Sequence, residues 1–108
     1  MIIQQMAGRA VFQAGKMGKA SLAAGEYLYA GLNGFEPGQA HEAHVHENQD
    51  KMYVVLEGSG VARVGEEEQV VAAGDLILAP AGVVHGMRNP GPGRLVVLVV
   101  FGPPPVKS

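Results

Sequence analysis

Residues 38–58 read GQAHEAHVHENQDKMYVVLEG, and this stretch decides how the rest of the chain is interpreted. Three histidines, His41, His44 and His46, fall within six residues and precede an apolar run. His44 and His46 are two residues apart, so an extended backbone places both imidazoles on the same face of a strand. Two neutral imidazoles on a rigid strand suit a divalent transition metal, but the metal needs at least one further ligand.

The candidate third ligand is His85, the remaining histidine of the chain. It lies in a second stretch, residues 74–89, which read GDLILAPAGVVHGMRN. The strand-like LILA run ends at Pro80 and Gly82, and these two residues favour a turn just before the histidine.

Together the two stretches resemble the paired signatures of the cupin superfamily. The first signature is Gly, five residues, His-x-His, three or four residues, Glu, six residues, Gly. Four of its positions are matched, at Gly38, His44, His46 and Gly58, whereas Lys51 stands at the Glu position. The second signature is matched throughout, at Gly74, Pro80, Gly82, His85 and Asn89. So many residues at fixed spacing argue against a chance match.

The resemblance is to a small single-domain bacterial cupin, and it implies an all-β double-stranded β-helix, a jelly-roll or cupin barrel. In such a barrel the two motifs face each other inside the mouth, which would bring His85 to His44 and His46. The resemblance implies one divalent transition metal on these histidines, with Zn, Fe, Ni and Mn as candidates. It also implies dioxygenation, isomerisation or decarboxylation of a small oxygenated molecule. The matching Gly, Pro and Asn positions shape turns.

Lys51 is where the chain departs from the family pattern. A lysine ammonium about 4 Å from a divalent ion is repelled by roughly 8 kcal/mol at an effective dielectric constant of about 20. If a metal binds, Lys51 must swing into water, be neutral, or pair with an acid such as Glu47, Asp50 or Glu57. The fourth alternative is that no metal binds. Asp50 is the obvious substitute carboxylate and Gln49 a weaker substitute, but strand alternation aims Asp50 to the opposite face unless a bulge turns it. We favour three histidines completed by water.

Lys51 and Tyr53 are the predicted substrate contacts because they share one face of an unbroken strand. Three neutral histidines leave the metal its full charge, which favours bidentate anionic oxygen ligands, and Lys51 would then contact the substrate. The alternative is a non-catalytic module that holds a small anion between the histidines and Lys51 without metal. His41, three residues before His44, is predicted to face the opposite side, in solvent at the rim.

The composition bounds the other possibilities. The length of 108 residues predicts one domain over residues 1–108 with one site. The formal net charge of −2 offers no positive electrostatic potential that would attract nucleic acid or an anionic membrane. Without cysteine, any metal must use mainly N and O ligands. We find neither a long apolar segment nor a signal-like N-terminus, so the expected location is the cytoplasm and the expected partner a small-molecule ligand.

Sixteen glycines and seven prolines punctuate short apolar runs, which predicts an all-β chain. Beyond the histidine strand, the expected strands are residues 11–14, 26–35, 52–56, 61–64, 69–72, 76–79 and 95–101. Residues 1–25 form an N-terminal strand or loop segment, in which residues 16–24 are a loop or one helical turn. Residues 65–68 are predicted as the acidic tip of a hairpin, and residues 102–108 as an extended, exposed, proline-rich tail.

The strands at residues 52–56 and 95–101 are apolar on both faces. Because a barrel interior covers only one face, the other must meet a second sheet or another chain. We therefore predict a homodimer, with coverage by the chain's own N-terminal segment as the alternative.

Overall fold

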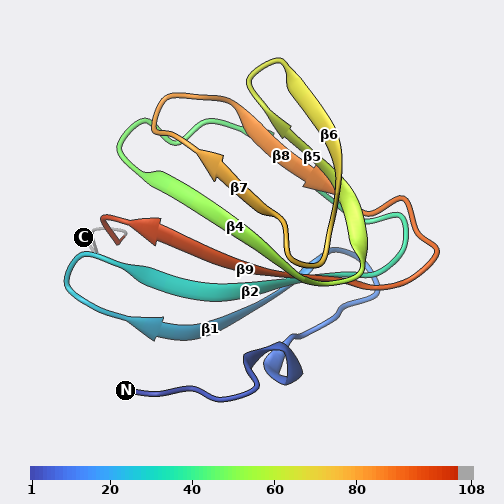
Figure 1. Ribbon diagram of the computed structural model, residues 1–108, viewed down its shortest axis with the longest axis horizontal. Helices are drawn as coiled ribbons and strands as arrows, with labels where there is room; N and C mark the ends of the chain where they lie inside the picture. Colours follow the sequence, from blue (N-terminus) through green and yellow to red (C-terminus); the bar gives the residue numbers. More distant parts are fainter. Residues whose placement is uncertain (105–108) are drawn as a thin grey trace.

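The computed structural model describes residues 1–104, which fold into two antiparallel sheets packed face to face (Figure 1). The elements are η1 (Met6–Arg9), β1 (Gly18–Ala24), β2 (Tyr29–Phe35), β3 (Ala40–His44), β4 (Asp50–Glu57), β5 (Ser59–Val64), β6 (Glu67–Ala72), β7 (Leu76–Ala79), β8 (His85–Arg88) and β9 (Leu95–Gly102). One sheet has the strand order β1-β2-β9-β4-β7 and the other the order β3-β8-β5-β6. The predicted all-β, jelly-roll architecture is confirmed.

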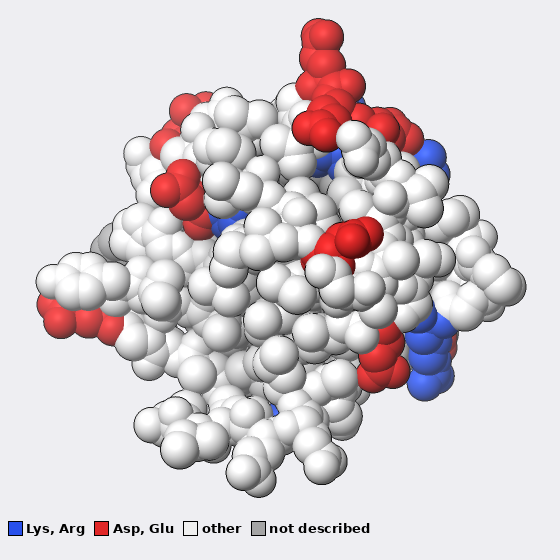
Figure 2. All heavy atoms as spheres, in the orientation of Figure 1, with Lys and Arg blue, Asp and Glu red and all other residues white. Residues whose placement is uncertain are grey.

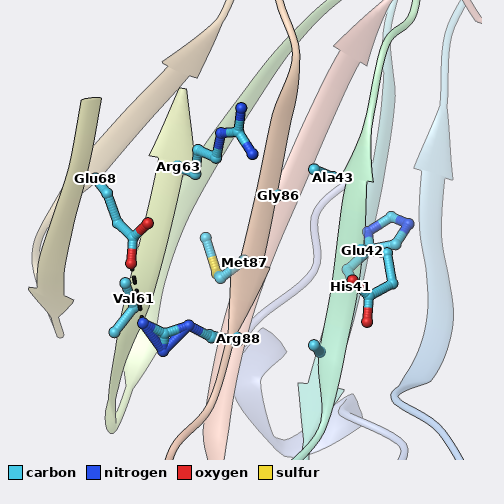
Figure 3. Close-up of a pocket in the computed structure, with 10 residues that line it drawn as sticks. His41, Glu42, Ala43, Val61, Arg63, Glu68, Gly86, Met87 and Arg88 are labelled. Carbon is cyan, nitrogen blue, oxygen red and sulfur yellow. Dashed lines mark hydrogen bonds and ion pairs between the residues drawn. The ribbon is translucent and has the colours of Figure 1, made fainter. Parts of the chain in front are cut away.

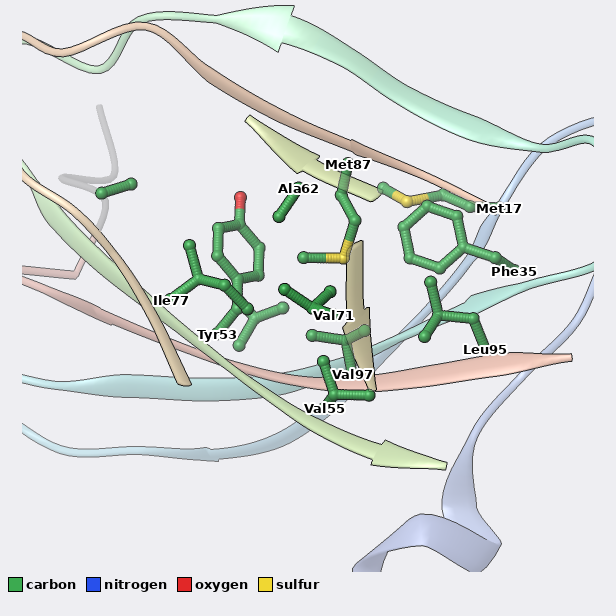
Figure 4. Close-up of a cluster of buried hydrophobic side chains, with 12 residues drawn as sticks. Met17, Phe35, Tyr53, Val55, Ala62, Val71, Ile77, Met87, Leu95 and Val97 are labelled. Atoms are coloured by element: carbon green, nitrogen blue, oxygen red, sulfur yellow. The ribbon is translucent and has the colours of Figure 1, made fainter. Parts of the chain in front are cut away.

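The space between the sheets is filled by a cluster of apolar side chains (Figure 4). Strand β4 contributes alternate residues to this space. Lys51, Tyr53 and Val55 are buried, whereas the residues between them are only half-buried. In Figure 4, Phe35 and Leu95 lie at one side of the cluster and Tyr53 at the other. The inward-facing residues of β4 therefore change from apolar Val55, through Tyr53, to the charged Lys51. The end of the barrel at Lys51 is its polar end.

Asn89 fixes the loop between β8 and β9. Its side chain is 1% exposed. The Nδ2 atom donates to the carbonyl oxygens of Phe35, at 3.1 Å, and Gly93, at 2.9 Å, while Oδ1 accepts from the Gly91 amide at 2.9 Å. These bonds satisfy a buried polar group and explain why this position shapes a turn.

The N-terminal quarter differs from the sequence-based expectation. Residues 11–14, predicted as a short strand, are irregular, whereas β1 occupies most of the 16–24 segment that was expected to be a loop or helical turn. The sequence of β1, GKASLAA, lacks β-branched residues, so pairing with β2 rather than intrinsic propensity makes it a strand. The predicted strand 26–35 begins only at Tyr29.

Two predicted boundaries at other turns also shift. β6 begins at Glu67, which leaves only Gly65 and Glu66 in the acidic hairpin tip. Gly102, predicted in the tail, is the last residue of β9 and pairs with Asp50. The end of the predicted tail, residues 105–108, lies outside the described residues.

The N-terminal segment packs closely against β1 and β2 (Figure 1). A Cβ atom on Gly18 would lie 1.9 Å, and one on Gly34 2.5 Å, from the carbonyl oxygen of Val11. The Gln39 side chain also donates a 2.7 Å hydrogen bond to the carbonyl of Gln13. This segment therefore covers part of the large sheet at β1 and β2, whereas the alternative to dimerisation concerned the outer faces of β4 and β9.

The surface carries scattered charges. On the face shown in Figure 2, acidic side chains project at the top, over the β5–β6 hairpin, and lysine and arginine side chains do not form a continuous patch. Within residues 1–104, no helix is long and apolar enough to cross a membrane.

Candidate metal centre

The structure brings His44, His46 and His85 together at the polar end of the barrel. Each offers a ring nitrogen, and the three nitrogens lie within 4.8 Å of one another. His44 and His85 are cross-strand partners of β3 and β8, with ring centroids 4.3 Å apart, and the His46 ring is 4.7 Å from that of His44. Metal–nitrogen bonds of about 2.1 Å hold tetrahedral ligand nitrogens about 3.4 Å apart, so side-chain movements of about 1 Å would complete the set.

Backbone hydrogen bonds fix the ring orientation of two of these histidines. Nδ1 of His44 donates to the carbonyl oxygen of Glu42 at 2.8 Å, and Nδ1 of His85 donates to that of Val83 at 3.0 Å. Because a carbonyl oxygen only accepts, the proton lies on Nδ1 and the lone pair on Nε2. Both Nε2 atoms are buried without a hydrogen-bond partner. Orphaned imidazole lone pairs fit a borderline divalent metal.

The electrostatic environment favours the neutral form of His46 and His85. Burial lowers the pKa of His46, and the neighbouring His44 lowers it further. Burial also lowers the pKa of His85, although the hydrogen bond to Val83 opposes this shift. Neutral imidazole is the form that binds a metal, so these lowered pKa values favour the ligating form of His46 and His85 at neutral pH.

His41 contradicts the prediction that it faces solvent on the opposite side. In the β3–β8 ladder, His41 pairs with Met87 and His44 with His85, so β3 carries one extra residue. This bulge turns His41 to the side of His44, and the two ring centroids are 4.4 Å apart. Burial, followed by the neighbouring His44, lowers the pKa of His41 to about 3. Strand alternation failed here because the sequence gives no sign of the bulge.

Gly86 makes room for this bulge. It lies on β8, between Ala43 on the neighbouring strand β3 and Arg63 on the neighbouring strand β5 (Figure 3). A Cβ atom on Gly86 would lie 3.0 Å from the backbone of Ala43 and 3.1 Å from the carbonyl oxygen of His41. We expect Gly86→Ala to push β3 outward, cost about 1–3 kcal/mol of stability and weaken zinc binding by about tenfold. Zinc competition with a chromophoric chelator and urea unfolding measure both effects.

The matched control is Gly93→Ala, because a Cβ atom there would meet no atom within 4 Å. This variant should retain wild-type stability and zinc affinity. Wild-type zinc affinity in Gly86→Ala would contradict the claim that the bulge positions the histidines.

Lys51 points into the barrel and is only 8% exposed. Its Nζ lies 5.4 Å from the ring centroid of Tyr53 and 5.8 Å from that of Phe101. The ion pairs among residues 1–104 are Arg88–Glu68 and Arg94–Glu36. Lys51 is therefore neither swung into water nor paired with Glu47, Asp50 or Glu57, which excludes two of the four alternatives for this residue. Burial, and then the charge of Lys19, lower the pKa of Lys51 to about 8.

The two substitute ligands considered for the missing Glu are engaged elsewhere. Asp50 is exposed, and its Oδ1 accepts a 2.9 Å hydrogen bond from the Ala81 amide. Gln49 donates a 2.8 Å hydrogen bond to the carbonyl oxygen of Pro103. No bulge turns Asp50 inward, so neither residue joins the histidine cluster.

Tyr53 shares the inward face of β4 with Lys51, as the alternation predicts. The side chain is 2% exposed, and its ring centroid lies 6.1 Å from that of His85. Burial raises the pKa of the Tyr53 hydroxyl, so the hydroxyl stays protonated at neutral pH. Tyr53 is thus an apolar wall with a hydrogen-bond donor beside the histidines.

Lys19 is a charged residue near the site that the sequence analysis missed. It lies on β1 opposite Asn33, which in turn lies opposite Val97 of the apolar core. Since residues directly opposite each other share one face of a sheet, Lys19 lies on the inward face. Its charge contributes to the lowered pKa values of Lys51 and His41. The residue was overlooked because residues 16–24 were expected to be a loop or helical turn, which gives Lys19 no inward face.

Comparison with known proteins agrees with this fold. Residues 31–101 match the family model described as the cupin domain, so the chain belongs to the cupin family. It is 38% identical over 77 residues to the uncharacterized protein SCO3923 of Streptomyces coelicolor, an alignment that covers 71% of each chain.

Solved structures show the same architecture over nearly the whole chain. TT1209 from Thermus thermophilus is 42% identical, with a TM-score of 0.92 over 97% of this chain and 100% of that one. An uncharacterized conserved protein with a double-stranded β-helix domain from Klebsiella pneumoniae is 23% identical, with a TM-score of 0.86 over 95% and 90% of the two chains. At that identity the second likeness supports the fold alone.

Proposed function

We propose that the chain is a metal-dependent cupin enzyme that acts on a small oxygenated molecule, by dioxygenation, isomerisation or decarboxylation. His44, His46 and His85 would hold one divalent metal, Zn, Fe, Ni or Mn. The observation that carries this proposal is the pair of buried Nε2 atoms on His44 and His85, each without a hydrogen-bond partner. Both rings are held by backbone hydrogen bonds, so the donors are preorganised.

A bound divalent metal would supply Lewis acidity toward a carbonyl or enolate oxygen, and oxygen chemistry if it is redox-active. Lys51 would hold the negative charge of the substrate at Nζ, close to the histidines. The rings of Tyr53 and Phe101 flank that ammonium and limit water, which strengthens its attraction for an anion. With a pKa of about 8, Lys51 can also hold or release a proton near neutral pH.

A second candidate function is a non-catalytic module that binds a small anion between Lys51 and the histidines without metal. The unpaired burial of Lys51 favours it, because a buried ammonium without a partner is costly and a bound anion would remove that cost. In this function the lysine is the centre of the site rather than an obstacle to it.

Lys51→Glu separates the two functions. If the site binds metal, the new carboxylate takes the family's fourth-ligand position and should raise zinc affinity by about tenfold or more. If the site binds an anion, the same change should abolish binding of oxalate and phosphate and leave the protein metal-free. Zinc competition and titration calorimetry measure these outcomes.

The matched control is Arg63→Glu, which makes the same charge change at an exposed position of the other sheet. It should alter neither zinc nor anion affinity. If Lys51→Glu also left both affinities unchanged, both arguments about Lys51 would fail.

We also propose that two copies pair through the outer face of β4, β7 and β9. Leu76 and Leu78 on β7 are 60% and 55% exposed there, whereas the N-terminal segment packs on β1 and β2. Light scattering should give twice the chain mass. A small-molecule ligand, rather than nucleic acid or a membrane, and a cytoplasmic location stay our predictions.

A further inference from the structure

A cavity of about 550 Å³ lies where β1, the edge of one sheet, faces β3, the edge of the other. Its walls include Lys16 and Lys19 on the β1 side and His41, Glu42 and His44 on the β3 side. Cavities of roughly 300–1,000 Å³ accommodate small-molecule ligands. The cavity is therefore large enough for the part of a ligand that extends beyond the metal centre.

The cavity reaches the metal centre through His41 and His44. Both side chains line the cavity, and their rings lie 4.4 Å apart. His44 is also one of the three histidines whose nitrogens converge. The bulge of β3 creates this connection, since regular alternation would have turned His41 away from His44.

The charge of the cavity favours an acidic ligand. Its walls carry two lysines and one glutamate, which leaves one net positive charge. Neither Lys16 nor Lys19 forms an ion pair in the part of the chain that the structure describes. Of the two lysines, Lys19 interacts with the metal centre, because its charge lowers the pKa values of His41, His46 and Lys51.

We propose that this cavity is the second half of the ligand site and that Lys19 binds a carboxylate at the far end of the ligand. The ligand is then a short acid with two oxygen donors at one end, placed at His44, His46 and His85, and a carboxylate at the other. The placement of the two oxygen donors rests on the proposed function, whereas the Lys19 contact rests on the cavity.

The test compares two five-carbon acids that differ only at the far end. Both 2-oxoglutarate and 2-oxopentanoate carry the same two-oxygen head, but only 2-oxoglutarate has a distal carboxylate. In calorimetric titrations of zinc-loaded protein, the wild type should bind 2-oxoglutarate about tenfold or more tightly than 2-oxopentanoate. Lys19→Met should reduce this preference to less than about threefold, and Lys19→Arg should restore most of it.

Arg63→Met is the matched control, because it removes one positive charge from an exposed position outside the cavity. It should keep the wild-type preference. The proposal is overturned if Lys19→Met keeps that preference, or if the wild type binds both acids equally or binds neither.

A titration of metal-free protein with glutarate separates this proposal from the metal centre. If only the metal centre is wrong, the protein holds no zinc, yet Lys19→Met still weakens glutarate binding. If only the cavity proposal is wrong, zinc binds stoichiometrically and Lys19→Met leaves the binding of all three acids unchanged.

Discussion

In the metal-free protein, Lys51→Met is expected to raise the free energy of unfolding by about 3 kcal/mol at pH 7. Lys51 is 8% exposed, and burial and the charge of Lys19 lower its pKa from 10.5 to about 8. Each pKa unit corresponds to about 1.4 kcal/mol, which gives the expected gain. Methionine keeps the apolar stem and removes the buried charge.

The effect of Lys51 should depend on pH in a defined direction. Its folded-state pKa lies below the unfolded value, so the unfolded chain binds the proton more tightly and the charged amine destabilises the fold. This cost is complete below pH 8 and disappears as the pH rises toward 10.5. The stability difference between Lys51→Met and wild type should therefore fall to less than about 1 kcal/mol at pH 10.

Urea unfolding in the presence of a chelator, at pH 7 and pH 10, measures both quantities. Lys16→Met is the control, because Lys16 is exposed and its removal should change stability by less than about 0.5 kcal/mol. A difference between Lys51→Met and wild type that is absent at pH 7, or equal at both pH values, would show that Lys51 is not a buried unpaired charge.

Gly58→Ala is expected to destabilise the protein by more than about 4 kcal/mol. Gly58 has φ 80°, and a Cβ atom there would lie 2.1 Å from the carbonyl oxygen of Arg94. Alanine therefore adds a backbone clash to the cost of a left-handed conformation, and relief requires the β4–β5 turn to move away from Arg94. Urea unfolding measures the loss.

Gly74→Ala separates the two contributions. Gly74 also has positive φ, 98°, but a Cβ atom there would meet nothing within 4 Å. This variant should lose only the conformational term of about 1–2 kcal/mol. If the two alanine variants were equally stable, close backbone contact would not be the reason for glycine at position 58.

The parts of the site carried by short motifs could be predicted from the sequence. His44 and His46 lie two residues apart, and Pro80 and Gly82 introduce the turn before His85. These local features, read through the family resemblance, predicted the convergence of the three histidines that the structure contains. The covered strands around Tyr53 and Val97 were equally predictable, since continuous apolar runs are typical of buried strands.

What the sequence could not reveal depends on contacts between distant residues. β1 is a strand because β2 pairs with it, and its alanine-rich sequence shows little strand propensity. His41 faces His44 because the backbone beside Gly86 accommodates an extra residue in β3. The burial of Lys51 without an acid depends on how Tyr53 and Phe101 flank it, whereas a flexible lysine alone suggests a solvent-exposed side chain.

The most direct test of the metal centre is elemental analysis of untagged protein, purified without chelator, alongside His44→Ala. His41→Gln serves as a control that changes a neighbouring histidine outside the converging set. We predict a stoichiometric transition-metal ion in the wild type and in His41→Gln, and its loss from His44→Ala. Wild-type protein that holds no metal after incubation with Zn, Fe, Ni and Mn, or equal metal content in His44→Ala, would contradict the three-histidine centre.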